Sequence, residues 1–388
     1  MNDAYLLLAL AAVAIALFGL ATHRLPLLAP DALHRVSTLD GLRGLLATLV
    51  VLHHFAITWQ WKLTGLWQLT PNGVINNFGA VAVSLFFMIT GYLFTRKIRK
   101  DPTVNWRGLL VGRVLRIYPM YIASVAALVV IACALSAEPL GLRNLLKPIA
   151  GWLLFGGPAV AGYEATRLIN ASVQWSLLYE ALFYCSLPWL CLLLRRQFSL
   201  WPVLLGSLGI VGFLVLFHQS LSPKYLTLFA VGMAVALAEP WLRARVQRPG
   251  HWGYSAVAVL ALIAAFSLQD YTQAQMLLLG IPFALMVLGN TLGGLLQLRV
   301  LKVLGEVSFS VYLLHGIVLT LLFTVFGLYG FSGSSLGQFA QFWLLPVLWL
   351  AFSLSVLTYW GIERPFVRWA AGAGRARRGV APPASPAL

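Results

Sequence analysis

The chain has 388 residues, of which 60% are hydrophobic and only 10% are charged. Soluble globular proteins usually carry about a quarter charged residues, so this composition excludes a soluble protein and indicates a polytopic membrane protein. The formal net charge of +16 at pH 7 lies in short connectors between apolar runs. Because it is not gathered on one face of a folded domain, it argues against a nucleic-acid partner.

Apolar runs long enough to cross a membrane recur along the whole chain and predict about eleven spans. The predicted fold class is therefore all-α, a polytopic transmembrane helical bundle. The runs lie at about residues 4–22, 44–61, 78–95, 119–136, 172–194, 199–217, 225–241, 253–268, 274–292, 303–328 and 338–361. The first run follows Asn2 and Asp3 and has no basic segment before it, so we interpret it as a retained span; a cleaved signal peptide is the alternative.

The basic residues predict the orientation of the bundle. With the amino terminus outside, the cytoplasmic connectors hold all but five of the 27 lysines and arginines, as the positive-inside bias requires. The five on the other side are Lys62, Arg143, Lys147, Arg167 and Lys224. We therefore expect a multi-pass membrane protein with the amino terminus outside and the carboxyl terminus in the cytoplasm.

Residues 38–55 place Arg43 at the start of an apolar helix and His54 eleven residues later. Eleven residues make about three turns, so both side chains lie on one stripe, about 16 Å apart along the axis. His54 is then near the middle of a hydrocarbon core about 30 Å thick. An ionisable side chain at that depth usually marks a function; a packed histidine that bonds a backbone carbonyl is the alternative.

Residues 107–119 are typical of a short surface helix that ends where Pro119 opens the next span. Arg113 and Arg116 are three residues apart on its face, so their guanidinium groups predict a fork for phosphate on the side to which Arg43 opens. The general positive-inside bias is the alternative explanation.

Two further spans carry ionisable residues near the predicted midplane. Glu180 is flanked by Ser176 and Tyr184 at four-residue spacing, and a buried carboxylate needs a partner, for which His54 is the natural choice. A neutral acid bonded to Tyr184 is the alternative. His315 either lines the same cavity or only ties helices together, and we favour the second interpretation.

Other segments have simpler interpretations. Glu363 and Arg364 form an acid-base pair that we expect to anchor the last span at the inner interface. The outer connector 137–171 predicts a short re-entrant or interfacial segment. No metal site is expected, because the cysteines lie inside apolar runs without ligand spacing: Cys133, Cys185 and Cys191.

Six segments, taken together and in order, resemble the acyltransferase family 3 of integral membrane proteins. They are Leu39-Asp40-Gly41-Leu42-Arg43 with His54 after a ten-residue gap, Phe86-Phe87 to Gly91-Tyr92-Leu93, Arg113-x-x-Arg116-x-Tyr118-Pro119, Trp175-Ser176-Leu177 to Glu180, Gly305 to His315, and Glu363-x-Pro365-Phe366. Thr90 stands where a serine is common. The resemblance implies a ten-helix acyltransferase domain (36–368) in a bacterial plasma (inner) membrane. Residues 1–35 depart from the family by an extra amino-terminal helix and connector, and the composition of residues 369–388 predicts a disordered cytoplasmic tail.

The resemblance also implies a function: transfer of an acyl group, commonly acetyl, from cytoplasmic acyl-coenzyme A to a hydroxyl of an extracytoplasmic glycan or lipid-linked saccharide. In this hypothesis Arg43, Arg113 and Arg116 bind the nucleotide end of the coenzyme. His54 acts as general base or acyl carrier, and Glu180 orients its imidazole. The alternatives are a proton-coupled exporter with a relay of His54, Glu180 and His315, and a scaffold without thioester chemistry.

Overall fold

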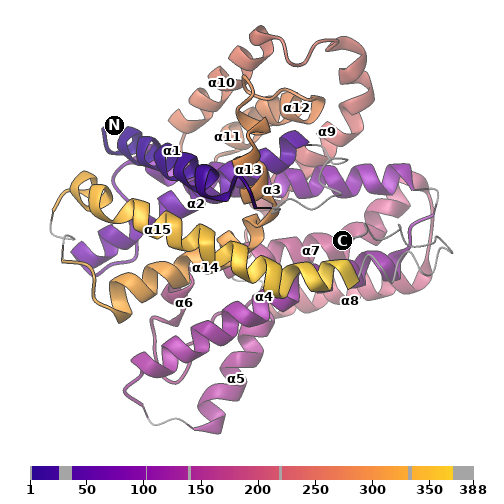
Figure 1. Ribbon diagram of the computed structural model, residues 1–388. Helices are drawn as coiled ribbons and strands as arrows, with labels where there is room; N and C mark the ends of the chain where they lie inside the picture. Colours follow the sequence, from indigo (N-terminus) through magenta and orange to yellow (C-terminus); the bar gives the residue numbers. More distant parts are fainter. Residues whose placement is uncertain are drawn as a thin grey trace, which may run out of the picture.

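The computed structural model describes residues 2–25, 37–101, 103–138, 141–217, 221–330 and 334–369, and these ranges form helices joined by turns and connectors, without a β-strand (Figure 1). The predicted tail beyond Trp369 and most of the predicted connector before residue 36 lie outside the described residues. The elements are α1 (Asn2–Thr22), α2 (Ser37–Thr64), α3 (Gly73–Lys100), α4 (Trp106–Leu135), α5 (Leu142–Leu153), α6 (Thr166–Ile169), α7 (Gln174–Arg195), α8 (Leu200–Phe217), η2 (Pro223–Tyr225), α9 (Leu226–Arg245), α10 (Trp252–Ser267), α11 (Gln273–Leu278), α12 (Gly280–Leu288), η3 (Leu295–Gln297), α13 (Arg299–Glu306), α14 (Ser308–Thr320), η4 (Leu321–Val325), α15 (Leu336–Thr358) and η5 (Tyr359–Glu363).

Nine helical segments of the described residues are long and apolar enough to cross a membrane. Two further predicted runs form the shorter apolar helices Trp252–Ser267 and Gln273–Leu288. The first of these has 16 residues, just under the about 17 to 25 that a spanning helix needs. The all-α, multi-pass fold class is confirmed, but the described residues hold nine full-length spans where the sequence predicts about eleven.

The helices α2 and α3 form the centre of the bundle. Most of their length is buried inside the protein, whereas α8 and α1 turn most of their surface outward. In Figure 1 α1 lies beside α15, and α7 lies beside α8. The face that α1 turns inward consists of alanines, Leu7, Thr22 and one aromatic ring, Phe18, which packs edge-on against Trp349 and Phe352 of α15.

Close backbone contact between α3 and α9 depends on two glycines. A Cβ atom on Gly91 would lie 2.3 Å from the carbonyl oxygen of Phe229, and one on Gly232 would lie 2.1 Å from that of Met88. Neither distance is sterically possible, so any other residue would push the two helices apart. Small residues at helix contacts are the usual means of tight packing within a membrane.

The helix α4 corrects one expectation about the arginine pair. Residues 107–119 do not form a separate surface helix, because α4 runs without a break from Trp106 to Leu135 with Pro119 inside it. It starts at Asn105, whose side chain accepts a hydrogen bond from the Gly108 N–H (2.9 Å). A proline removes one helical hydrogen bond, and helices in membranes tolerate this loss. Arg113 and Arg116 therefore lie within a long helix that continues into the bundle.

The connector 137–171 contains α5 and α6. α5 docks on α4 through Trp152, which is fully buried and whose carbonyl oxygen accepts a hydrogen bond from the Tyr121 hydroxyl (2.6 Å). The indole N–H of Trp152 donates to the carbonyl oxygen of Pro158 (2.9 Å). A short helical segment thus exists where the sequence predicts a re-entrant or interfacial one, and it holds the chain that leads into α7.

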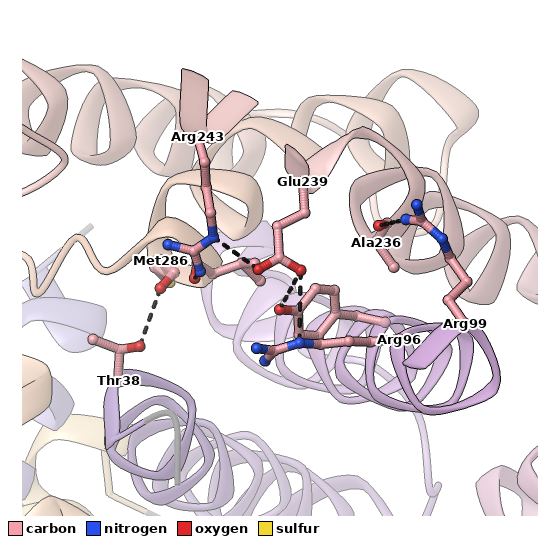
Figure 2. A network of polar contacts seen from close by, with 9 residues as sticks. Thr38, Arg96, Arg99, Ala236, Glu239, Arg243 and Met286 are labelled. Carbon is pink, nitrogen blue, oxygen red and sulfur yellow. Dashed lines mark hydrogen bonds and ion pairs between the residues drawn. The ribbon is translucent and has the colours of Figure 1, made fainter. Parts of the chain in front are cut away.

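Several helix termini with basic residues lie together at one end of the bundle, which we call the basic end. Figure 2 shows Thr38, near the start of α2, beside Met286, with Arg243, near the end of α9, close by. Arg96 and Arg99, near the end of α3, follow across the same view. The opposite end includes the connector between α2 and α3. The first residues of α1 and α15 also lie together, because Gly337 neighbours the Asp3 carboxylate, so these two helices run in the same direction.

Candidate active site

The helix α2 carries two of the predicted site residues. Arg43 lies near its start, at the basic end, and His54 lies in the interior; both side chains are half-buried. Their separation of eleven residues corresponds to about 16 Å along an α-helix. The helix therefore connects the basic end to the middle of the bundle, as the sequence predicts.

The imidazole of His54 contacts the imidazole of His315 on α14. The Nδ1 atom of His54 lies 3.0 Å from Nε2 of His315, although the two residues are 261 positions apart in the sequence. His315 is completely buried. Its side chain therefore does more than tie helices together, which is the role that the sequence favours for it.

The backbone around the two rings indicates where their protons lie when both are neutral. Nδ1 of His315 faces the carbonyl oxygen of Val311 (3.0 Å), and a carbonyl only accepts, so this nitrogen carries the proton. Nε2 of His315 is then an acceptor, and Nδ1 of His54 carries a proton that faces both this nitrogen (3.0 Å) and the carbonyl oxygen of Val50 (3.1 Å). The remaining nitrogen, Nε2 of His54, keeps a free lone pair and has no hydrogen-bond partner among the described residues.

The chain before α7 packs against α14 and holds His315 in place. Gly316 makes this possible, because a Cβ atom there would lie 2.3 Å from the carbonyl carbon of Asn170. One turn earlier on α14, the hydroxyls of Tyr312 and Ser176 lie 2.7 Å apart. Each lies 3.1 Å from the carbonyl oxygen of Val173. These contacts fix α14 relative to α7.

Glu180 does not orient His54. Its carboxylate accepts a hydrogen bond from the Tyr184 hydroxyl one turn further along α7, which is the alternative that the sequence left open. It also lies within electrostatic reach of the Tyr312 hydroxyl. The partner that the sequence assigns to His54 is thus replaced by His315, because the packing of α7 turns Glu180 toward Tyr184.

Trp67 covers His54 from the end opposite the basic end. This residue belongs to the connector between α2 and α3, and its indole ring is stacked on the imidazole of His54 with 6.3 Å between centroids and an angle of 18°. Trp61 packs edge-on against Trp67 at 5.7 Å, and the Lys62 ammonium lies 4.2 Å from the centroid of the Trp61 ring. Two aromatic rings therefore border His54 on this side.

His53 has a structural role in this arrangement. Its Nδ1 atom lies 3.2 Å from the carbonyl oxygen of Ile75 on α3. The ring fills the space that Gly79 leaves free, since a Cβ atom on Gly79 would lie 2.5 Å from it. His53 thus joins α2 to α3 and leaves His54 as the histidine of α2 that is available for chemistry.

The basic end holds a buried ionic cluster that the sequence predicts only in part. Arg116 forms an ion pair with Glu363 (2.7 Å), whose side chain is 1% exposed, and Ser310 donates to the same carboxylate (3.0 Å). Glu363 therefore joins α4, α14 and the last helix; it is not paired with Arg364, which lies over the Trp360 ring. Arg43 lies within electrostatic reach of Arg116 and Glu363.

The two arginines of α4 differ in what compensates their charge. Glu363 neutralises Arg116, whereas Arg113 forms no close ion pair with a described carboxylate. Arg113 lies over the Phe94 ring (5.2 Å) and close to the hydroxyl of Tyr184. Since Tyr184 bonds Glu180, polar side chains connect Arg113 to Tyr312, one turn from His315. The predicted phosphate fork is thus reduced to Arg113 and Arg43, which makes no hydrogen bond with the described residues.

A second carboxylate at the basic end, Glu239, was not singled out by the sequence. Figure 2 shows it between Arg243 and Arg96. Its oxygens accept from Nε of Arg243 (2.9 Å) and from the Tyr92 hydroxyl (2.9 Å), and Nε of Arg96 lies 3.8 Å away. The network joins α3 to α9. Glu239 lies at the end of an apolar run, a position that did not predict its burial. The burial results from the packing of α3 against α9.

No group of histidine, cysteine and carboxylate side chains within the described part of the chain could hold a metal ion. The site therefore consists of an imidazole pair in the interior, arginines at one end, and aromatic rings at the other. Among the residues of the site, His315 was noted in the sequence, but its contact with His54 was not predicted. Trp67 was not noted, since a tryptophan in a connector has no local signature.

A multi-pass helical bundle with a base-competent imidazole in its interior and cationic side chains at one end has the features of a membrane-embedded transferase. A family model described as an acyltransferase domain matches residues 36–362. The chain belongs to this family, acyltransferase family 3, and is an acyltransferase. No curated protein and no solved structure matches the chain.

Proposed function

We propose that the protein transfers an acyl group, with acetyl as the first candidate, from acyl-coenzyme A to a hydroxyl group of a glycan or lipid-linked saccharide. The proposal depends on the contact between Nδ1 of His54 and His315. With the proton on Nδ1, the lone pair of Nε2 is free. A neutral imidazole held in one tautomer is what general-base catalysis on a hydroxyl requires.

The donor is proposed to bind from the basic end. Coenzyme A carries phosphate groups at one end of a long, thin arm and the thioester at the other. Arg113 forms no ion pair with a described carboxylate. Arg43 lies within electrostatic reach of Asp40, Glu306 and Glu363 but forms no hydrogen bond with a described residue, so both guanidinium groups can donate to phosphate. A span of about 16 Å from Arg43 to His54 is within the reach of the extended arm. Tyr184, Glu180 and Tyr312 supply polar groups between the two.

The reaction balances with one base. Nε2 of His54 takes the proton from the acceptor hydroxyl while the oxygen of that hydroxyl attacks the carbonyl carbon of the thioester. The C–S bond breaks, and the coenzyme thiolate leaves and recovers the proton from the imidazolium. Nδ1–H of His54 remains bonded to His315 throughout, so the positive charge that develops on His54 is shared with a hydrogen-bond acceptor. A transient acyl group on Nε2 is the two-step form of the same chemistry.

The proposed location is the plasma membrane of a bacterium, with the basic end in the cytoplasm. The positive-inside bias supports this orientation. Cytoplasmic acyl-coenzyme A would then reach the basic end directly, and an extracytoplasmic acceptor would approach His54 from the side of Trp67. The carboxyl terminus would be cytoplasmic and the amino terminus outside.

One of the contacts that the exporter hypothesis needs is present, and another is absent. A proton relay through His54 and His315 needs the 3.0 Å contact that is present, but Glu180, its third member, bonds Tyr184. Membership of an acyltransferase family favours transfer chemistry over both transport and a purely structural scaffold.

The test uses the purified protein with acetyl-coenzyme A labelled in the acetyl group and extracted envelope glycans as acceptor. His54→Ala should retain donor binding and lose transfer by at least about 100-fold, whereas His23→Ala, at an exposed position, should not. Arg113→Gln should weaken donor binding, more strongly at low salt, because salt screens the attraction that the variant lacks. Full transfer by His54→Ala would refute the proposal, and unchanged donor affinity of Arg113→Gln would remove this arginine from the donor site.

A further inference from the structure

The connection between the end of α9 and the start of α10 (Figure 1) lies at the basic end of the bundle and lines an open surface cavity of about 510 Å³. Its lining includes Arg245, Arg248, His251, Tyr254 and Val257. It shares no residue with the imidazole pair or with the arginines proposed to bind the donor. Its role is therefore a separate question from the acyl transfer.

The connection that forms the cavity is held in a defined conformation. Asn290, which is completely buried, donates to the carbonyl oxygen of Pro249 (2.6 Å) and to the Ser255 hydroxyl (3.0 Å). The backbone N–H of His251 donates to the carbonyl oxygen of Arg248 (2.9 Å), and its ring Nδ1 accepts from the Gly253 N–H (3.2 Å). The cationic side chains thus project from a fixed frame, which favours a defined binding site over a loose basic loop.

The charge of the cavity is not compensated. None of the residues lining it is a carboxylate, and neither Arg245 nor Arg248 forms an ion pair with a described residue. The first turn of α10 adds the positive end of a helix dipole at the same place. The chemistry that fits is an anionic oxygen group, of which a phosphodiester is the most common.

Two features point to the membrane as the source of that phosphodiester. Trp241 and Trp252, on the two sides of the connection, are 56% and 76% exposed, and exposed tryptophans are typical of the membrane-water interface. Arg245 lies over the Trp241 ring at 3.9 Å. From the cavity, the exposed apolar residues Val257 and Leu260 continue along α10, where acyl chains would lie.

We propose that this cavity binds the headgroup of an anionic phospholipid, with its phosphodiester between Arg245 and Arg248 and its acyl chains along α10. The lipid contributes to holding α10, one of the two short apolar helices, at the edge of the bundle. A lipid bound at the interfacial end of this helix would stabilise its position, because its 16 residues fall just short of the length that spans the hydrocarbon.

The test measures how much phosphatidylglycerol and phosphatidylcholine the purified full-length protein retains through detergent washing. The wild-type protein should retain phosphatidylglycerol preferentially. The variant Arg245→Gln with Arg248→Gln should lose this preference by roughly tenfold or more, since each basic residue near a membrane surface contributes substantially to anionic-lipid binding. The single variant Arg248→Gln, which leaves the stacking of Arg245 on Trp241 intact, should lose part of it.

The matched control is Lys97→Gln with Lys100→Gln, which removes two exposed cations from the end of α3, also at the basic end. It should retain phosphatidylglycerol like the wild type. Equal losses in both double variants would overturn the proposal in favour of a general charge effect. Unchanged lipid retention with weakened acyl-coenzyme A binding in the Arg245→Gln, Arg248→Gln variant would overturn it in favour of a donor subsite.

Discussion

At the scale of single residues, the proposed reactivity depends on the two contacts at Nδ1 of His54. Val311 sets the tautomer of His315, and both the carbonyl oxygen of Val50 (3.1 Å) and Nε2 of His315 (3.0 Å) face Nδ1 of His54. The Val50 carbonyl favours the proton on Nδ1, and the contact with His315 holds the ring against α14. His315 is therefore a positioning residue, whereas His54 is proposed to touch the reacting atoms.

Replacement of His315 tests this role. His315→Ala should lower kcat by roughly 100-fold through misplacement of the base, with the affinity for acyl-coenzyme A unchanged. His315→Gln keeps an acceptor oxygen at a similar distance and should recover a large part of the rate. Steady-state kinetics with both variants are the measurement. If alanine and glutamine were equally active, the acceptor at this position would be irrelevant to catalysis.

The indole ring of Trp67 is stacked on the imidazole of His54 at the end of the bundle opposite the basic end, and we expect it to limit the access of water to His54. Trp67→Ala should therefore increase the hydrolysis of acyl-coenzyme A in the absence of acceptor several-fold, because water then reaches the base. Trp67→Phe should keep hydrolysis near the wild-type rate. Release of free thiol is the readout, with Trp252→Ala as control; unchanged hydrolysis in Trp67→Ala would show that the indole does not shield the site.

At the scale of helices, charged side chains determine how the last helix is attached. Arg116 on α4 and Glu363 on η5 are both removed from bulk water, and their 2.7 Å contact compensates the cost of that burial. The pair lies at the end of the chain segment that follows α15, so it fixes that segment against α4 and, through Ser310, against α14. The pair is therefore expected to contribute mainly to assembly of the bundle.

A double-mutant cycle tests this attachment. Arg116→Gln or Glu363→Gln alone leaves one buried charge without its partner and should lower the free energy of unfolding by about 3–5 kcal/mol. The double variant removes both charges and should lose less than the two single variants together. Thermal unfolding in detergent gives the comparison. Strict additivity would show that the two side chains do not interact energetically.

Local sequence patterns predicted the helices better than they predicted how the helices meet. The apolar runs and the eleven-residue spacing of Arg43 and His54 follow from helix geometry, which depends only on neighbours in the chain. The break expected at Pro119 did not occur, because the intrahelical cost of a proline is small beside the cost of ending a helix inside a bundle. The ion pair of Arg116 with Glu363 has no local signal at all.

At the scale of the whole molecule, the segregation of charge defines two different ends. The ends of α3 and α9 bring basic residues together beside the start of α2 (Figure 2). The connector with Trp67 lies at the other end of the bundle. In the proposed function, a donor with phosphate groups and a neutral or lipid-linked acceptor reach one imidazole from opposite sides. That proposal requires the basic end to face the compartment that contains acyl-coenzyme A.

Labelling of single introduced cysteines tests the orientation. Leu66→Cys, at an exposed position beside Trp67, should react with a membrane-impermeant maleimide in intact cells. Lys100→Cys, at the end of α3, should react only after the membrane is permeabilised. The wild-type chain, with its three native cysteines, gives the background. The reverse pattern would place the arginines outside and exclude a cytoplasmic donor at that end.

The sequence by itself determined that this chain is a multi-pass helical membrane protein and that His54 lies about three turns beyond Arg43. It also carried the six segments that place it in its family, since hydropathy, helical period and local motifs are properties of neighbouring residues. Only the tertiary structure decided that His315 and not Glu180 faces His54, that Glu363 neutralises Arg116, and that Trp67 covers the imidazole. The physical reason is that the rotation of each helix about its axis is set by packing against helices that are distant in the sequence. Such a rotation changes which side chains meet, although the pattern of residues along each helix stays the same.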